Sequence, residues 1–328
     1  MKVFRSIDEA RGALSGCAVA IGNFDGVHLG HRQLLAEAKA LAAARGAPAV
    51  VLTFEPHPAR VLSPEFAPPL IATMARKLRL LEDEGLDAVV IQPFDRAYAA
   101  TSAEAFVRRD LVEALGARDI VVGFDFTFGR GRAGTPEALA RLAGEDAEVH
   151  VVPAYARDRL VVSSSKIREL VLAGRVAQAG ELLGRPFIVD GRVVPGRGRG
   201  RTIGIPTANV DPATELLPAA GVYAVQAVVQ GLEGLFAGGA NIGRKPTFGE
   251  GELTVEVHLL GLEADLYGRD MAVAFLERLR GERRFPSVEE LVGQIRLDLE
   301  QVREVARRAP PTPLRLAADS LTGPGTRQ

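Results

Sequence analysis

Hydrophobic and polar positions in the first half of the chain follow two alternating patterns. Five short apolar runs, rich in β-branched residues, are separated by stretches in which apolar positions recur at helical spacing. The runs are "CAVAI", "PAVVLTF", "DAVVIQPF", "DIVVGF" and "EVHVV", which begin at Cys17, Pro48, Asp87, Asp119 and Glu148. Continuous apolar strands separated by helices predict a doubly wound α/β domain, in which helices cover both faces of a parallel sheet.

The pattern changes after Gly184. Turns that contain glycine now join the strand-like runs "PFIVDGRVV", "GVYAVQAVVQG", "LFAGGANIG", "LTVEVHLL" and "MAVAFLERL". These strands predict a small antiparallel β-barrel, and the stretch "SVEELVGQIRLDLEQVREVARR" predicts a long C-terminal helix. We therefore expect an α/β domain over 1–184 and a barrel domain over 185–309. Residues 310–328 lack periodicity and are expected to form a flexible tail.

Composition narrows the class of protein. The 328 residues are 47% hydrophobic, which is enough for two ordinary globular domains, and the formal net charge is only -1. That charge argues against a broad nucleic-acid surface, and no apolar run is long enough to span a membrane. The single cysteine, Cys17, cannot form an internal disulfide, and the N-terminus lacks a signal pattern. We expect a cytoplasmic protein in which Cys17 is an inert core thiol.

The stretch "VAIGNFDGVHLGH" carries the first candidate site. Small residues between a predicted strand and a predicted helix place backbone amides where they can bind phosphate groups. The residues of this turn are Gly22, Asn23, Phe24, Asp25 and Gly26. His28 and His31, on the first helical turn, are expected to bind phosphates and to stabilise charge that develops on an attacked phosphorus. For either histidine alone, a helix cap is the alternative.

Two later segments follow further predicted strands. "VGFDFTFGRGRAG" fits the dinucleotide pattern G-x-G-x-x-G, but it lies in the fourth strand–helix unit after an aromatic-rich connection. We expect instead a loop that carries Arg130 and Arg132 over a phosphate group. "VSSSKIREL" offers Ser163–Ser165 as helix caps or phosphate donors. Arg168 lies one turn further on, and a surface salt bridge is its alternative role.

The glycine-rich stretch "PGRGRGRTIGIPTANV" introduces a second site. It has too many glycines for a strand interior and lacks the Gly-Lys-Ser/Thr of a P-loop. A nucleotide flap at the barrel mouth is expected, with a flexible arginine-rich hairpin as the alternative. Thr207 and Asn209 alternate to one side and offer oxygen ligands to Mg²⁺. The expected flap residues are Gly198, Gly200, Arg201, Gly204 and Pro206.

The strand-like run "LTVEVHLL" adds a carboxylate to this site. Glu256 and His258 alternate with apolar residues and therefore share one face of the strand. A carboxylate in such surroundings can act as a general base that takes the proton from a primary alcohol. A structural role is the expectation for His258.

The motifs of the first half resemble a known family. "GNFDGVHLGH", "TFEPHP", "FDFTFGRGRAG" and "VSSSKIR" are similar to the nucleotidyltransferase half of the bacterial bifunctional riboflavin kinase/FAD synthetase family, and the resemblance covers the chain to about residue 309. It implies transfer of AMP from ATP to FMN with release of pyrophosphate. The implied contacts to ATP phosphates are Asn23, His28, His31, Ser164 and Arg168. The implied residues near flavin and nucleotide are Phe54, Pro56, Pro58, Asp125, Phe128 and Arg132.

The motifs of the second half resemble the riboflavin kinase half of the same family. They are "GRTIGIPTAN" from Gly200, "NIGRKPTF" from Asn241 and "VEVHLL" from Val255. The resemblance implies transfer of the γ-phosphoryl group of ATP to the 5′-hydroxyl of riboflavin, with Glu256 as base. It also implies Mg²⁺ on Thr207 and Asn209. The family commonly has Asp or Asn and then Phe where this chain has Gly261 and Leu262.

The leading hypothesis is a bifunctional transferase that makes FMN from riboflavin and FAD from FMN. A rival of the same fold is a monofunctional FAD synthetase whose kinase domain is impaired, suggested by Gly261. A rival of another class is a flavin- and nucleotide-binding regulator without turnover. The expected partners are riboflavin, FMN and ATP, with no nucleic acid and no membrane, on a monomer or weak homo-oligomer.

Overall fold

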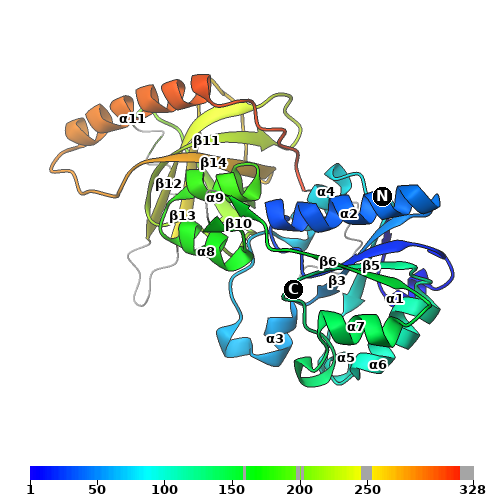
Figure 1. Ribbon diagram of the computed structural model, residues 1–328. Helices are drawn as coiled ribbons and strands as arrows, with labels where there is room; N and C mark the ends of the chain where they lie inside the picture. The colour runs from blue at the N-terminus through cyan, green and yellow to red at the C-terminus, as the bar shows by residue number, and fades with distance from the viewer. Residues whose placement is uncertain (158–159, 197–199, 201–202, 245–252, 318–328) are drawn as a thin grey trace. The chain divides into compact units, whose positions relative to one another are not determined.

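The computed structural model describes the whole chain except residues 158–159, 197–199, 201–202, 245–252 and 318–328. The chain forms two compact units (Figure 1). The first contains Met1–Pro68 and Lys77–Val162. The second contains Pro69–Arg76 and the chain from Ser163 onward.

The first unit is built on a six-stranded sheet with the order β1-β4-β3-β2-β5-β6. Every neighbouring pair is parallel, as the continuous apolar runs predicted. The expected strands are all present, and β1 is additional. The bounds are β1 (Lys2–Phe4), β2 (Ala18–Ile21), β3 (Ala49–Glu55), β4 (Ala88–Pro93), β5 (Asp119–Gly123) and β6 (Glu148–Val152).

Helices cover the sheet of the first unit on both faces, so the doubly wound prediction is confirmed. Helix α2 packs against β2, β3 and β5, whereas α7 packs against β6 from the other side (Figure 1). The helical bounds are α1 (Ile7–Ala10), α2 (Leu29–Arg45), α3 (Pro58–Leu62), η1 (Pro64–Phe66), α4 (Met74–Asp83), α5 (Arg96–Ala99), α6 (Ala103–Ala105), η2 (Phe106–Ala114), η3 (Arg130–Arg132) and α7 (Pro136–Ala143). A two-stranded ribbon, β7 (Ala156–Arg157) and β8 (Leu160–Val161), follows β6.

The strand order creates a topological switch point between β2 and β5. From β2 the chain moves outward to β3 and β4, and it then returns to form β5 on the other side of β2. The connections that leave β2 and β5 therefore diverge at their carboxyl ends. Ligands of open α/β sheets bind at such a topological switch point. The motifs after β2 and β5 both lie there.

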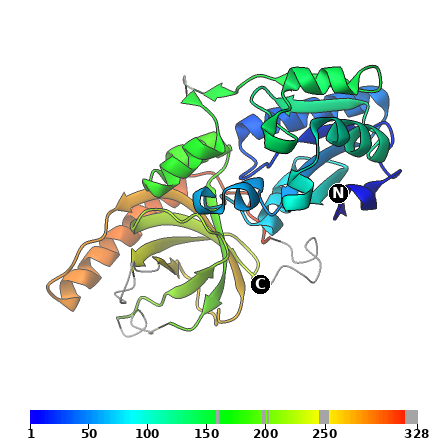
Figure 2. The same cartoon turned by 90° about the horizontal axis from the view of Figure 1, so that it is seen from below.

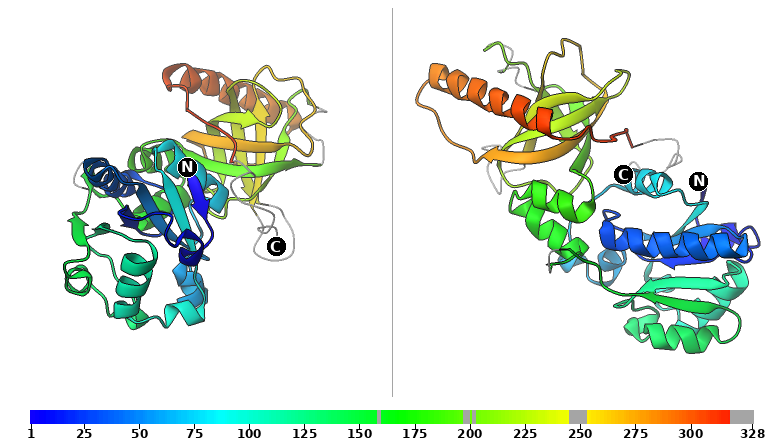
Figure 3. Two further views of the ribbon diagram at one scale, coloured as in Figure 1. Left: turned by 90° about the vertical axis from the view of Figure 1, so that its right-hand side faces the viewer. Right: turned by 45° about the horizontal axis from the view of Figure 1, so that its top comes forward.

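The second unit contains a closed antiparallel barrel, with the order β10-β13-β12-β11-β14-β9. Helices α8 and α9 pack against each other, and α9 packs on the barrel (Figure 2). Helix α11 lies along the outside against β11 and β12 (Figure 3). The bounds are α8 (Ser164–Leu172), α9 (Val176–Leu183), β9 (Phe187–Val194), β10 (Ala208–Pro212), β11 (Gly221–Val229), β12 (Phe236–Arg244), β13 (Leu253–Leu259), β14 (Asp270–Arg280) and α11 (Val288–Arg308).

The segment that follows α11 differs from the flexible tail expected from sequence. Thr312 donates from its backbone amide to Oε1 of Gln226 at 2.9 Å. Leu314 is only 8% exposed and packs in an apolar cluster with Ile188 of the barrel. The carbonyl of Arg315 accepts a hydrogen bond from Arg76 at 2.7 Å. Residues 310–317 are therefore fixed on the second unit, because long-range contacts compensate for the lack of periodicity; residues 318–328 lie outside the described chain.

The length and hydropathy of each described helix were compared with what a membrane-spanning helix needs. Within the described residues, no helix combines the length and the hydropathy that crossing a bilayer would require.

Candidate active sites

The turn after β2 is tightly held and partly strained. The Gly22 amide donates to the Leu52 carbonyl at 3.1 Å, and the Thr53 hydroxyl donates to the Asn23 carbonyl at 3.2 Å. Phe24 is fully buried with φ of 48°, and Val27 has φ of 41°. Non-glycine residues rarely adopt this left-handed region, and for a β-branched residue it is a clear outlier. This strain could not be predicted from the local sequence, because it depends on the packing around the turn.

His28 and His31 cap helix α2 reciprocally. The His31 amide donates to Nδ1 of His28 at 3.2 Å, and the His28 amide donates to Nδ1 of His31 at 3.3 Å. The two rings stack with their centroids 3.5 Å apart. The capping role that the sequence left open is therefore confirmed for both histidines.

Capping fixes the proton position of each neutral imidazole. A ring nitrogen that accepts a backbone N–H bond carries no proton, so Nδ1 of His28 and of His31 is unprotonated. The proton of each neutral ring then lies on Nε2, which is a donor. The contacts that cap the helix thus use Nδ1 of each ring, and the N–H donor of each neutral ring is at Nε2.

Aromatic side chains gather where β3 and β4 end. Phe54 packs edge-on against Phe94, with centroids 5.7 Å apart, and both pack near Tyr98. The Tyr98 hydroxyl donates to the buried carboxylate of Asp110 at 2.9 Å. Phe94 and Tyr98 were not singled out from the sequence, because only the parallel pairing of β3 and β4 brings them to Phe54. Pro56 is exposed and Pro58 is half-buried at the same end of β3.

The connection after β5 divides into an exposed and a buried part. Asp125 is exposed, and Arg132 is exposed while donating from Nε to the Thr127 hydroxyl at 2.9 Å. Phe128 is only 7% exposed and packs on Phe106 and Phe126 in the core. Its ring therefore anchors the loop from within.

Ser164 and Arg168 lie on α8 of the second unit. Ser163 is the N-cap, since its hydroxyl accepts from the Lys166 amide at 3.3 Å. Arg168 is only 9% exposed and donates from Nε to the Pro69 carbonyl at 2.8 Å. Arg168 is therefore buried and does not lie on the surface, where the alternative salt bridge was expected.

The second site is a row of polar side chains across three barrel strands. In the antiparallel register, Glu256 on β13 lies opposite Asn209 on β10 and opposite Asn241 on β12. Directly opposed residues share a face, so the carboxylate lies between two amides. The alternate residues of β13, including Val255 and Val257, fill the barrel interior. Asn241 belongs to a motif found in the sequence, but only the strand register assigns it to this row.

Two short contacts hold the segment that leads into β10, one at Pro206 and one at Gly200. His258 Nδ1 lies 2.7 Å from the Pro206 carbonyl, so that nitrogen carries the proton and donates, and the expected structural role of His258 is confirmed. A Cβ on Gly200 would lie 2.3 Å from the Ile205 carbonyl oxygen and 3.2 Å from Oγ1 of Thr207. This chain segment therefore needs glycine at position 200. Gly204 and Pro206 are exposed, whereas Gly198 and Arg201 lie outside the described residues.

A second carboxylate approaches the barrel row from the segment before α11. A Cβ placed on Gly243 would meet Glu282 Oε1 at 3.0 Å and Asn241 Nδ2 at 3.3 Å. Glu282 therefore lies close to the amide that flanks Glu256. Nothing in the local sequence indicated this, because Glu282 is brought there by the path from β14 to α11.

Comparisons with known proteins agree on the family. The model of the FAD synthetase family matches residues 10–166, and the model of the riboflavin kinase family matches residues 183–306. Curated relatives named bifunctional riboflavin kinase/FMN adenylyltransferase include that of Escherichia coli K12, 39% identical over 93% of this chain and 97% of its own length. The relative from Bacillus subtilis is 36% identical over 86% of this chain and 90% of its own. The chain belongs to the bifunctional riboflavin kinase/FMN adenylyltransferase family.

A solved structure supports the same architecture across both halves. It is titled a macrolide-efflux protein from Streptococcus pneumoniae, is 35% identical, and aligns over 92% of this chain and 98% of its own with a TM-score of 0.84.

Gly261, at which the family resemblance suggested a departure, occupies a turn after β13. Its φ is 70°, and nothing lies within 4 Å of the place where a Cβ would stand. The left-handed region favours glycine and, among other residues, Asn and Asp. Glycine therefore suits this backbone conformation, and the barrel strands close around the turn.

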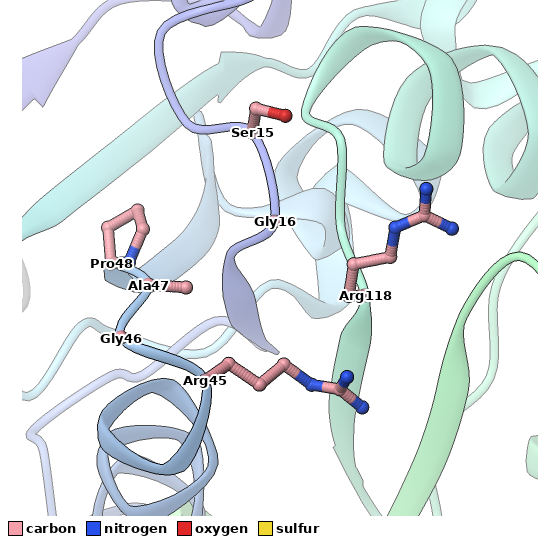
Figure 4. Close-up of a pocket in the computed structure, with 7 residues that line it drawn as sticks. All are labelled: Ser15, Gly16, Arg45, Gly46, Ala47, Pro48 and Arg118. Carbon is pink, nitrogen blue, oxygen red and sulfur yellow. The ribbon is translucent and has the colours of Figure 1, made fainter.

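A different hollow lies at the opposite edge of the parallel sheet (Figure 4). Its volume is about 550 Å³, and its walls are the residues that precede β2, β3 and β5: Ser15, Gly16, Arg45, Gly46, Ala47, Pro48 and Arg118. This is the amino-terminal edge of the strands, away from the switch point where ligands of such sheets bind.

The charged side chains beside this hollow form ion pairs and hydrogen bonds with one another. Ligand atoms of Asp119, Glu148 and His150 lie within 4.8 Å of each other, a spacing that could suit a metal ion. Arg45, however, hydrogen-bonds Asp119 and lies 3.9 Å from Glu148. Burial tends to raise the pKa of Asp119, but hydrogen bonds from Arg45 and His150 outweigh it and lower the pKa. The cluster is therefore an ion-pair network in which Arg45 supplies the positive charge.

Proposed function

We propose that this chain is a transferase that phosphorylates riboflavin to FMN and then adenylylates FMN to FAD, each time from ATP. The assignment places adenylylation in residues 1–184 and phosphorylation in residues 185–309. The observation that carries it is that each half of the chain has its own set of chemical groups. The barrel has the Asn209–Glu256–Asn241 row, and the first unit has the capped His28–His31 pair. Both halves retain their chemistry-bearing residues, which favours two activities over one activity or a regulator.

In the kinase half, Glu256 is the general base. It takes the proton of the riboflavin 5′-hydroxyl, and that oxygen attacks the γ-phosphorus of ATP while ADP leaves. The amides of Asn209 and Asn241 flank the carboxylate and hold it in position. The flap, anchored through Pro206 to His258, closes over the nucleotide. The assigned flap residues are Gly198, Gly200, Arg201, Gly204 and Pro206.

The donor set of the barrel suits Mg²⁺. The Thr207 hydroxyl and the Asn209 amide provide hard oxygen ligands on one side of an extended segment, as this small cation prefers. When bound, Mg²⁺ supplies charge neutralisation for the ATP phosphates.

In the adenylyltransferase half, a phosphate oxygen of FMN attacks the α-phosphorus of ATP, and pyrophosphate leaves. Backbone amides of the turn from Gly22 to Gly26 bind phosphate oxygens, and Nε2–H of His28 and His31 stabilises the charge that develops. No covalent enzyme intermediate is needed, because positioning and charge stabilisation suffice. The turn residues are Gly22, Asn23, Phe24, Asp25 and Gly26. Ser164 and Arg168 are assigned further contacts to the ATP phosphates.

The flavin of this half is assigned to the aromatic end of β3. Phe54, flanked by Phe94 and Tyr98, offers an apolar wall that suits an isoalloxazine ring. Pro56 and Pro58 extend this wall. Asp125 and Arg132 lie on the loop after β5 near flavin and nucleotide, and Phe128 supports that loop from the core.

The remaining assignments concern the surroundings of the enzyme. Its partners are small molecules, namely riboflavin, FMN, ATP and FAD, and not nucleic acid. We place it in the cytoplasm, where its one thiol stays reduced. A monomer or weak homo-oligomer is sufficient, because each site is assigned to residues of one chain.

The deciding experiment supplies the purified chain with ATP, Mg²⁺ and either riboflavin or FMN, and follows the flavins by chromatography. Formation of FMN and then FAD from riboflavin is the expected outcome. Conversion of added FMN alone would identify a monofunctional FAD synthetase. No turnover of either flavin would favour the regulator.

A further inference from the structure

One buried carboxylate of the first unit takes no part in the reactions described above. Asp110 on η2 is only 4% exposed. It accepts hydrogen bonds from the Tyr98 hydroxyl at 2.9 Å and from Nε and Nη2 of Arg109 at 2.6 and 3.1 Å. Burying a carboxylate is costly unless such partners compensate its charge. Asp110 is therefore the centre of a hydrogen-bonded network that includes one aromatic side chain.

The helix that carries Asp110 has an unusual backbone. It is π-helical, and the Leu115 amide donates to the Asp110 carbonyl, five residues earlier, at 3.1 Å. Adjacent residues of an α-helix do not face each other, yet Arg109 and Asp110 pair directly here. Segments of π-helix are rare and occur frequently at functional sites. The unusual backbone therefore coincides with the buried carboxylate and its arginine partner.

Asp110 fixes the orientation of the Tyr98 ring. Burial and the charge of Asp110 raise the pKa of Tyr98, so its hydroxyl stays protonated and donates. The backbone amide of Tyr98 donates to Oδ1 of Asp95 at 2.7 Å. The ring packs against Phe54 with centroids 6.4 Å apart, and against Phe94 with centroids 6.0 Å apart. Because the ring is held at its hydroxyl and at its backbone, it limits the orientations that Phe54 can adopt.

We propose that Asp110 is a positioning residue for the flavin: through the Tyr98 hydroxyl it holds the Phe54 wall in the orientation that stacks on the isoalloxazine ring of FMN. This inference rests on the proposed function of Phe54. Aromatic rings stack in particular offset or edge-on geometries, so a ring with the wrong tilt loses part of the contact. A preorganised wall also lowers the cost of binding. Loss of the hydrogen bond therefore weakens FMN binding and leaves ATP binding unchanged.

The test uses the full-length enzyme and begins with Tyr98→Phe, which removes the hydroxyl and keeps the ring. Tyr267→Phe is the matched control, because Tyr267 is 54% exposed and lies in the second unit. Asp110→Leu removes the acceptor, whereas Asp110→Asn keeps an oxygen that can accept from the Tyr98 hydroxyl. Phe54→Ala removes the wall itself. Steady-state adenylylation gives KM for FMN and KM for ATP separately, and a merely structural role would not distinguish the two substrates.

We expect Tyr98→Phe and Asp110→Leu each to raise KM for FMN by about 10-fold, the size of effect expected for one hydrogen bond to a charged group. KM for ATP and the rate of riboflavin phosphorylation should stay at the level of Tyr267→Phe. Asp110→Asn should recover most of the wild-type KM for FMN. The double variant Tyr98→Phe/Asp110→Leu should be no worse than either single variant, because both substitutions remove the same hydrogen bond.

Three outcomes would overturn the inference: a wild-type KM for FMN in Tyr98→Phe, equal increases in the KM values of both substrates, or a double variant whose effect is the product of the single effects. Protection of Cys17, in the core of the first unit, shows whether each variant remains folded. If Asp110→Leu exposes Cys17, Tyr98→Phe decides alone, since it removes a single oxygen. An unchanged KM for FMN in Phe54→Ala, or no adenylylation by the wild type, would instead contradict the proposed function, so the two failures are distinguishable.

Discussion

Glu256 on β13 lies directly opposite Asn209 on β10, so the proposed general base and a proposed Mg²⁺ ligand share one face of the barrel. The two residues are 47 positions apart in the sequence, and the antiparallel register alone brings them together. Asn241 completes the row on the other side. A substitution in this row should therefore affect riboflavin phosphorylation and leave FMN adenylylation unchanged.

Replacing Glu256 by Gln should lower riboflavin phosphorylation by about 10²- to 10⁴-fold, since the amide cannot accept the substrate proton. FMN adenylylation should continue at the wild-type rate, because its residues are assigned to the other half. Flavin chromatography with each substrate measures both rates. Glu263→Gln, at an exposed position, is the matched control. Undiminished phosphorylation by Glu256→Gln would refute the base assignment.

Replacing His28 by Asn separates capping from phosphate binding. Asn is a favourable N-cap, so the free energy of unfolding should change by less than about 0.5 kcal/mol. The Nε2 donor is lost, and FMN adenylylation should fall by about 10²- to 10³-fold. Thermal unfolding and steady-state kinetics, with kinase activity as the internal control, measure the two effects. A fully active His28→Asn enzyme would show that His28 only caps the helix.

A buried ion pair should control the stability of the second unit. Arg76 donates from Nε to Asp190 at 2.9 Å and also holds the Arg315 carbonyl, and its side chain is only 3% exposed. Arg76→Met would leave the carboxylate unpaired and should cost about 3–5 kcal/mol. Urea unfolding followed by loss of kinase activity measures this.

Two further variants test whether the loss of stability comes from the unpaired buried charge. Arg76→Met/Asp190→Leu should regain most of the stability, because no charge is then buried alone. Lys166→Met breaks a more exposed pair with Glu169 and should cost less than about 1 kcal/mol. Equal losses in Arg76→Met and Lys166→Met would contradict the importance assigned to the buried pair.

Cys17 should resist thiol reagents in the native protein. The side chain is fully buried, and burial raises the pKa of the thiol to about 12. A raised pKa keeps the thiol protonated and unreactive as pH rises through about 8.5, where an ordinary cysteine ionises. Titration with a chromogenic disulfide at pH 8.5 should therefore detect no thiol without urea and one thiol in urea. Rapid labelling of the native chain would contradict the assignment.

Much of the fold could be predicted from local sequence. Apolar runs with β-branched residues marked the strands β2 to β6 and the barrel strands β9 and β11 to β14, because strand and helix periodicities are properties of consecutive residues. The sequence missed β1, only three residues long, the barrel strand β10 and the fixed segment 310–317. Each of them depends on partners from other parts of the chain.

The sequence by itself determined which chemical groups are available: the turn with its two histidines, the carboxylate Glu256 and the glycine-rich stretch before Thr207. Only the tertiary structure decided how they are combined. Strand register set Asn209 and Asn241 beside Glu256, and the path from β14 to α11 brought Glu282 close to Asn241. The reason is physical: a periodic pattern encodes the face on which a side chain lies, whereas long-range packing and hydrogen bonding select its neighbours on that face.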